Sequence, residues 1–184
     1  MSTFADALAR AAGKAPTKTA VVDDRRRLTY AELDDLVNGV AHRLRAQGVA
    51  VGHVVTSQLG NCVEALAVGL AANRIGAVHN PVATIFRARE LEFVRRQTAS
   101  TVFVDSAESE LFDGPLSTGS TDGPPAEPDA PRFLVYTSGS TSEPKGVLHS
   151  DRTLAAECAA QALYHQLTAD EVFVMPSPVS HVSA

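Results

Sequence analysis

The chain has 184 residues and a formal net charge of −5, and 45% of its residues are hydrophobic while 20% are charged. This is the composition of an ordinary globular domain that is long enough to bury a sizeable core. The acidic balance, the aromatic content of 5% and the absence of tryptophan argue against nucleic-acid binding, which needs basic patches and stacking platforms. The two cysteines, Cys62 and Cys158, lie outside any Cys/His cluster, so we expect reduced thiols and no metal site.

The first residues carry neither the basic segment nor the apolar segment of a secretory signal. No apolar run approaches the length that a membrane span requires. We therefore expect a cytoplasmic protein without a membrane span.

The N-terminal third predicts a helix, a small hairpin and a longer helix. Ser2 or Thr3 can cap a helix that starts at Phe4. Residues 19–23 and 27–29 read as two short strands, and we expect the arginines between and beside them to form a solvated hairpin tip. Thr29 and Glu32 have the spacing of a capping box, and the helical pattern that follows ends at Gly48.

The next segments alternate between strand and helix patterns. Asn61 is the expected N-cap of the first of these helices, which ends near Gly76. Such alternation predicts a parallel sheet with helices on its faces. The expected elements are a strand at 53–59, a helix from 61 to about 76, a strand at 77–82, a helix at 89–97 and a strand at 101–105.

Residues 113–131 differ in composition from the rest of the chain. They contain three glycines, five prolines and little apolar content. We read them as a flexible linker. The predicted organisation is thus an α/β subdomain at 1–112, the linker at 113–131, and a second unit at 132–184.

Residues 137–146 read T-S-G-S-T-S-E-P-K-G and lie between apolar runs at 133–136 and 147–149. Apolar runs on both sides of a Ser/Thr/Gly-rich stretch predict strand, loop and strand. The loop suits a polyphosphate, because glycines let the backbone present N–H groups, hydroxyls donate hydrogen bonds, and Lys145 adds a compact positive charge. It is neither a Walker A loop, which needs G-K-[ST] before a helix, nor a dinucleotide-binding fingerprint.

After the loop, Ser150 or Thr153 can cap a helix that runs to His165. Residues 172–175 have the apolar, β-branched pattern of a strand. The strand leads into P-S-P-V-S-H, which ends at His181.

The stretch from Tyr136 to Val147 resembles the signature loop of the adenylate-forming superfamily, [YF]-T-S-G-[ST]-T-G-x-P-K-G-V, with Ser142 where glycine is usual. Three other stretches resemble landmarks of the same superfamily. They are R-x-L-T-Y-A-E-L-D at 26–34, N-P-x-x-x-x-x-R-x-R-E-L at 80–91, and P-x-x-H-x-x-G at 178–184, where Ala184 replaces the final glycine.

The resemblance implies the N-terminal part of an acyl-CoA synthetase or aryl-acid ligase, a group that includes enzymes of fatty acid metabolism. Such enzymes join a small-molecule carboxylate to ATP with Mg²⁺, giving an acyl-adenylate and pyrophosphate, and then transfer the acyl group to coenzyme A. By position in the motif, Lys145 and His181 would be catalytic residues. The ATP phosphates would be held by Thr137, Ser138, Gly139, Ser140, Thr141, Ser142, Lys145 and Gly146.

The superfamily's adenine-binding segment, acidic magnesium ligand and C-terminal catalytic lysine have no counterpart in these 184 residues, and a helix and strand usual before the loop are replaced by the linker. We therefore expect the chain to be inactive alone, with the remaining part of a ligase or a second copy as its partner. Two alternatives stay open. In the first alternative, the chain is a non-catalytic remnant that binds a phosphate ligand or a protein. In the second, it is an adenylation domain that loads a carrier protein.

Overall fold

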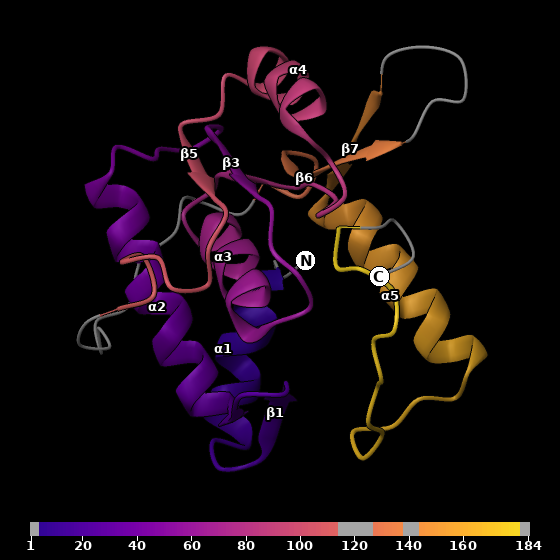
Figure 1. Ribbon diagram of the computed structural model, residues 1–184. Helices are drawn as coiled ribbons and strands as arrows, with labels where there is room; N and C mark the ends of the chain where they lie inside the picture. The colour runs from indigo at the N-terminus through magenta and orange to yellow at the C-terminus, as the bar shows by residue number, and fades with distance from the viewer. Residues whose placement is uncertain (1–3, 114–126, 138–143, 181–184) are drawn as a thin grey trace.

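A computed structural model describes residues 4–113, 127–137 and 144–180. It is an α/β protein, as predicted, with a two-stranded hairpin beside a five-stranded sheet (Figure 1). The elements are α1 (Phe4–Lys14), β1 (Thr19–Val22), β2 (Arg27–Thr29), α2 (Tyr30–Ala46), β3 (Val54–Ser57), α3 (Val63–Arg74), β4 (Val78–Pro81), α4 (Ala88–Thr98), β5 (Val102–Val104), β6 (Pro131–Thr137), β7 (Lys145–Ser150) and α5 (Asp151–Tyr164).

The strand order of the large sheet is β5-β3-β4-β6-β7. The first four strands are parallel, and β7 pairs antiparallel with β6. Figure 1 shows α4 on one face of the sheet and α3 on the other, with α2 and α1 on the side of α3 that is away from α4. Because β5, β3, β4 and β6 are parallel, their carboxyl ends share one edge of the sheet. Ligands of open α/β sheets bind at that edge.

The core lies between α2, α3 and the sheet. Val37, Val40 and Leu44 of α2 are fully buried, as are Val63 and Val68 of α3. The predicted capping box at the start of α2 is confirmed, since the Thr29 hydroxyl accepts from the Glu32 N–H and the Glu32 carboxylate accepts from the Thr29 N–H. No helix among the described residues is both long and apolar enough to span a membrane.

The start of α3 differs from the sequence prediction. Cys62, not Asn61, is the N-cap residue, and no side chain at that position caps the helix. The carboxylate of Asp23, from the β1–β2 turn, instead accepts the Val63 N–H at 2.9 Å. The Asn61 side chain binds the main chain of residues 175–179.

The arginines of the β1–β2 turn were expected to be solvated, but two of them form ion pairs. Arg25 lies 2.6 Å from the carboxylate of Glu64, and Arg26 contacts its other oxygen. The Glu64 side chain is only 5% exposed. A buried carboxylate needs such partners, so the hairpin is fastened to the first turn of α3.

Residues 172–175 do not form the predicted strand. Their side chains are largely exposed, with Val172 at 88% and Val174 at 85%. A strand needs a neighbouring strand to satisfy its N–H and C=O groups, and no strand of the described chain pairs with this segment. The apolar pattern alone could not reveal that.

The end of the predicted linker contacts the rest of the protein. Residues 127–130 form a turn in which the Ala130 N–H donates to the Glu127 carbonyl. Asp129 accepts two hydrogen bonds from Arg152, at 2.6 and 2.7 Å. The first sheet residue after the linker is Pro131, two residues earlier than the apolar run suggested. Residues 114–126 lie outside the described part of the chain.

His79 on β4 is buried beneath α3. Its Nε2 lies 2.8 Å from the Ser57 hydroxyl oxygen, and its Nδ1 has no hydrogen-bond partner among the described residues. A Cβ on Gly69 would lie 2.7 Å from that Nδ1, so α3 approaches the ring this closely only because residue 69 is glycine. Burial lowers the pKa of His79 from 6.5 to about 3.

This burial predicts an acid-sensitive fold. Below pH 6.5 the unfolded chain protonates His79 while the folded protein does not, so stability is complete above that pH and falls as the pH decreases toward about 3. Between about pH 7 and about pH 5 the loss should be about 2 kcal/mol. Urea unfolding at both pH values measures it, and His79→Gln should lack this part of the dependence. An imidazole NMR signal of folded His79 that titrates near neutral pH would contradict the prediction.

Candidate phosphate-binding site

The predicted strand–loop–strand is a hairpin of β6 and β7. Tyr136 pairs with Gly146 and Thr137 pairs with Lys145 at its open end. The connecting residues 138–143 lie outside the described part of the chain, as does His181. The predicted phosphate ligands Ser138, Gly139, Ser140, Thr141 and Ser142 are among these residues, so their roles stay predictions.

Thr137 and Lys145 form the base of the loop. The Thr137 hydroxyl donates to the Lys145 carbonyl at 3.4 Å across the hairpin. Both residues are exposed. The hairpin therefore brings one hydroxyl and one ammonium side chain together where the sheet ends.

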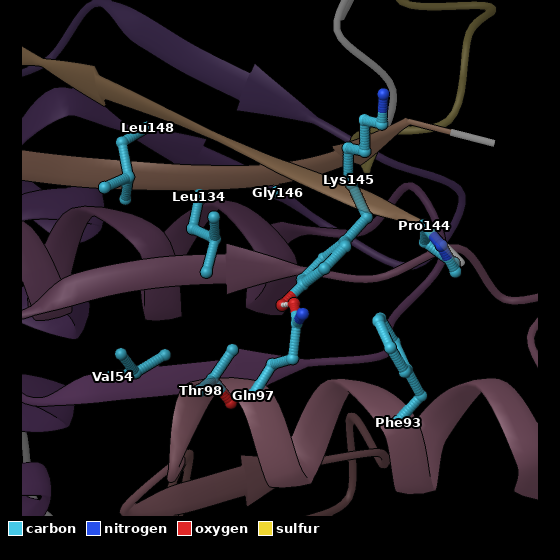
Figure 2. A pocket seen from close by; sticks show the side chains of 10 residues that line it. Val54, Phe93, Gln97, Thr98, Leu134, Pro144, Lys145, Gly146 and Leu148 are labelled. Atoms are coloured by element: carbon cyan, nitrogen blue, oxygen red, sulfur yellow. Dashed lines mark hydrogen bonds between the residues drawn. The ribbon is translucent and has the colours of Figure 1, made fainter. Parts of the chain in front are cut away.

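Lys145 points away from α4. In Figure 2 its side chain rises on one side of the hairpin, while Phe93 and Gln97 lie on the other. This follows from strand geometry, since side chains of successive residues point to opposite faces. The charge of Lys145 therefore stands on the sheet face opposite α4, free to meet an anion.

A groove of about 710 Å³ lies between α4 and the hairpin. Tyr136 closes one part of it by donating from its hydroxyl to Gln97 Oε1 at 3.1 Å, and its ring meets Phe93 edge-on at a centroid distance of 6.4 Å. Burial raises the pKa of Tyr136, which keeps the phenol protonated as a donor. The groove is lined by Val54, Phe93, Gln97, Thr98, Leu134, Tyr136, Pro144, Lys145, Gly146 and Leu148.

Tyr136 and Gln97 support the base of the loop, and sequence reasoning assigned them no role. The contact joins residues 39 positions apart. No spacing rule connects a strand residue with a distant helix residue. The signature has an aromatic residue at the position of Tyr136. This indicated only that a ring is favoured there.

Gly146 is a strand residue that leaves space for neighbouring side chains. The loop glycines were expected to let the backbone present N–H groups, but Gly146 lies in β7 and is not among the described glycines with positive φ. A Cβ at this position would lie 2.9 Å from Leu134 Cδ1 and 3.5 Å from Tyr136 Cε1. The glycine leaves room for two β6 side chains on the α4 face of the hairpin.

A buried ion pair anchors the other end of the hairpin. Arg132 on β6 donates from Nε to Asp151 of α5 at 3.0 Å and from Nη1 to the Gly76 carbonyl at 3.2 Å. Both side chains are nearly inaccessible, at 5% and 4% exposure. The pair thus ties β6 and α5 to the loop that precedes β4.

A parallel sheet that ends in an antiparallel hairpin with a Ser/Thr/Gly/Lys loop is an arrangement suited to holding a polyphosphate. The sequence profile of the family described as AMP-binding enzyme matches residues 8–184. The chain belongs to the AMP-binding enzyme family, as the signature loop indicated.

Two curated relatives show the range of this family. The chain is 29% identical to the long-chain-fatty-acid–CoA ligase FadD13 of Mycobacterium tuberculosis, over 86% of this chain and 36% of the relative. It is 30% identical to the phosphinothricin tripeptide synthetase PhsC of Streptomyces viridochromogenes, over 91% of this chain and 17% of the relative. The chain therefore spans well under half of the length of either relative.

Among solved structures, the inhibitor-bound N-terminal domain of FACL13 from Mycobacterium tuberculosis has the same fold. Its TM-score is 0.83 at 25% sequence identity, and the match covers 98% of this chain and 52% of that one. The chain therefore has the fold of the first part of adenylate-forming enzymes.

Proposed function

We propose that this protein is an AMP-forming acid–thiol ligase in which the β6–β7 loop holds the phosphates of ATP. The observation that carries the proposal is the pairing of Thr137 with Lys145 at the base of the signature loop, with both side chains exposed. An exposed ammonium beside hydroxyl groups is suited to a phosphate chain. Lys145 and His181 are the proposed catalytic residues, and Thr137, residues 138–142, Lys145 and Gly146 form the proposed phosphate site.

The first step joins a carboxylate to ATP. A carboxylate oxygen attacks the α-phosphorus, a new P–O bond forms, and the bond to the β-phosphate oxygen breaks to release pyrophosphate. Negative charge grows on the leaving pyrophosphate, and Lys145 with the loop donors stabilises it by position and charge. Mg²⁺ would arrive with ATP and neutralise phosphate charge. Among the described residues, no three His, Cys, Asp or Glu side chains gather into a metal site of their own.

The second step transfers the acyl group to a thiol, for which we propose coenzyme A. The thiol sulfur attacks the acyl carbon to form a C–S bond, the bond from that carbon to the AMP phosphate oxygen breaks, and AMP and the thiol proton are released. The match to FadD13, named as a CoA ligase, supports this acceptor, with 29% identity over 86% of this chain. The substrate of the first step would be a small-molecule carboxylate.

The second candidate is an adenylation domain that delivers its acyl group to a carrier-protein thiol. The match to the peptide synthetase PhsC favours it, with 30% identity over 91% of this chain. Both candidates share the first step, so only the thiol acceptor separates them.

The native protein that contains these residues tests the proposal. It should exchange labelled pyrophosphate into ATP only when a carboxylate is present, and a panel of acyl and aryl acids identifies the substrate. With that substrate, coenzyme A should release AMP and form a thioester. Transfer to a phosphopantetheinylated carrier protein but not to coenzyme A would select the second candidate. No carboxylate-dependent exchange with any acid would contradict both and favour a non-catalytic binding role.

A further inference from the structure

Two residues of α4 hold the side chain of Tyr136 on β6. The Tyr136 hydroxyl donates to Gln97 Oε1 at 3.1 Å, and its ring meets the Phe93 ring edge-on at a centroid distance of 6.4 Å. Phe93 and Gln97 are four residues apart, so α4 presents them on one face. Figure 2 shows both of them on the same side of the hairpin. One helix thus contacts both the ring and the hydroxyl of this tyrosine.

The open space beside Tyr136 makes these two contacts important. The groove of about 710 Å³ between α4 and the hairpin is lined in part by Tyr136, and the residue is only half-buried. A core side chain is fixed by close packing on all sides, which Tyr136 lacks where it faces the groove. The hydrogen bond to Gln97 and the contact with Phe93 therefore set where the ring lies.

The Tyr136 ring in turn lies close to the start of β7. Tyr136 pairs with Gly146 across the hairpin, and a Cβ on Gly146 would lie 3.5 Å from Tyr136 Cε1. Lys145 precedes Gly146 in the chain and pairs with Thr137, the residue after Tyr136. A shift of Tyr136 is therefore passed on through one peptide bond in each strand to Thr137 and Lys145.

We infer that Gln97 is a positioning residue that acts through Tyr136 to fix the place of the Lys145 ammonium group. This inference rests on the proposed function, in which Lys145 balances the charge that grows on the leaving pyrophosphate. Gln97 lies on the α4 side of the hairpin, whereas the Lys145 side chain points to the opposite side (Figure 2). Gln97 therefore supports the strand from behind, as the precise placement of a charged group requires.

Hydrogen exchange of β7 in the native protein tests the contact. Gln97→Ala removes the acceptor of the Tyr136 hydroxyl and, because Gln97 is exposed, leaves no buried cavity. The main-chain N–H groups of β7 should exchange roughly 3- to 10-fold faster in this variant. Gln97→Glu keeps an acceptor oxygen and should exchange at the native rate. The control is Gln161→Ala, which removes another exposed amide contact, 2.9 Å to Glu157 within α5.

A double-mutant cycle with Lys145 tests the role in the reaction. Gln97→Ala should lower the rate of carboxylate-dependent ATP–pyrophosphate exchange roughly 3- to 10-fold in the otherwise native protein. In the Lys145→Ala background the loss should be less than about 2-fold, because both changes act through one ammonium group. Tyr136→Phe, which removes the donor and keeps the ring, should match Gln97→Ala, and Gln97→Glu should keep the native rate. Tyr164→Phe is the control for the loss of a hydroxyl, at a residue of α5 that is 83% exposed.

Three results would count against the inference, and they are distinguishable. Unchanged hydrogen exchange of β7 in Gln97→Ala would overturn it at the level of the contact. Equal losses of exchange rate in the native and Lys145→Ala backgrounds would overturn the positioning role while leaving the contact established. Absence of carboxylate-dependent exchange in the native protein would overturn the proposed function and this role with it, whatever the hydrogen exchange of β7 shows.

Discussion

Replacing Lys145 by alanine should lower the rate of carboxylate-dependent ATP–pyrophosphate exchange by about 10²–10³-fold. The reason is the place of the lysine, at the first position of β7, exposed and paired with Thr137 across the base of the loop. Its charge would balance the negative charge that develops on the leaving pyrophosphate. The exchange rate at saturating carboxylate, with the KM for ATP, measures the effect.

Lys14→Ala is the matched control for this prediction. The chain has only three lysines, and Lys14 is exposed at the end of α1. Both changes remove one positive charge, so a general effect of net charge would appear equally in both variants. We expect Lys14→Ala to keep the native exchange rate. A rate for Lys145→Ala within about 3-fold of the native rate would refute the phosphate-clamp role and favour a protein-interaction role for the hairpin.

The sequence predicted the parallel sheet and its helices because their signals are local. The capping box at Thr29 and Glu32, the apolar period of α2 and the positive φ of Gly48 all lie within one element or at its end. The hairpin could also be predicted from the sequence, since its two apolar runs lie directly on either side of the loop. The strands extend further than those runs, because Thr137 ends β6 and Lys145 begins β7, where the two residues pair.

The failures all depend on contacts between residues far apart in the chain. Residues 172–175 have strand composition, but whether a strand forms depends on a neighbour that the local pattern does not contain. Asn61 is of a residue type that often caps helices, yet its side chain binds a segment 114 to 118 residues away. The sequence around Arg25 predicts a solvated side chain, but the structure pairs it with the distant Glu64. For Asn61 and Arg25 a polar side chain satisfies a distant group, and for residues 172–175 a distant partner is lacking; propensity and periodicity specify neither.

Replacing Arg132 by methionine should lower the free energy of unfolding by about 3–5 kcal/mol. The change would remove the cation that faces the buried Asp151 carboxylate at 3.0 Å and the hydrogen bond to the Gly76 carbonyl. A carboxylate that is 4% exposed cannot regain water as compensation. Urea unfolding at neutral pH measures the loss as a lower midpoint.

Arg152, the residue after Asp151 in α5, offers a matched control. Arg152 pairs with Asp129 at 2.6 Å, but these side chains are 58% and 71% exposed, so Arg152→Met should lower the urea midpoint far less than Arg132→Met does. The double variant Arg132→Met with Asp151→Leu should recover much of the loss, because no buried charge remains at the site. Similar losses for Arg132→Met and Arg152→Met would show that burial does not set the strength of these pairs. A large loss confined to Arg132 would instead identify its buried pair as the anchor that holds the phosphate-loop hairpin to α5.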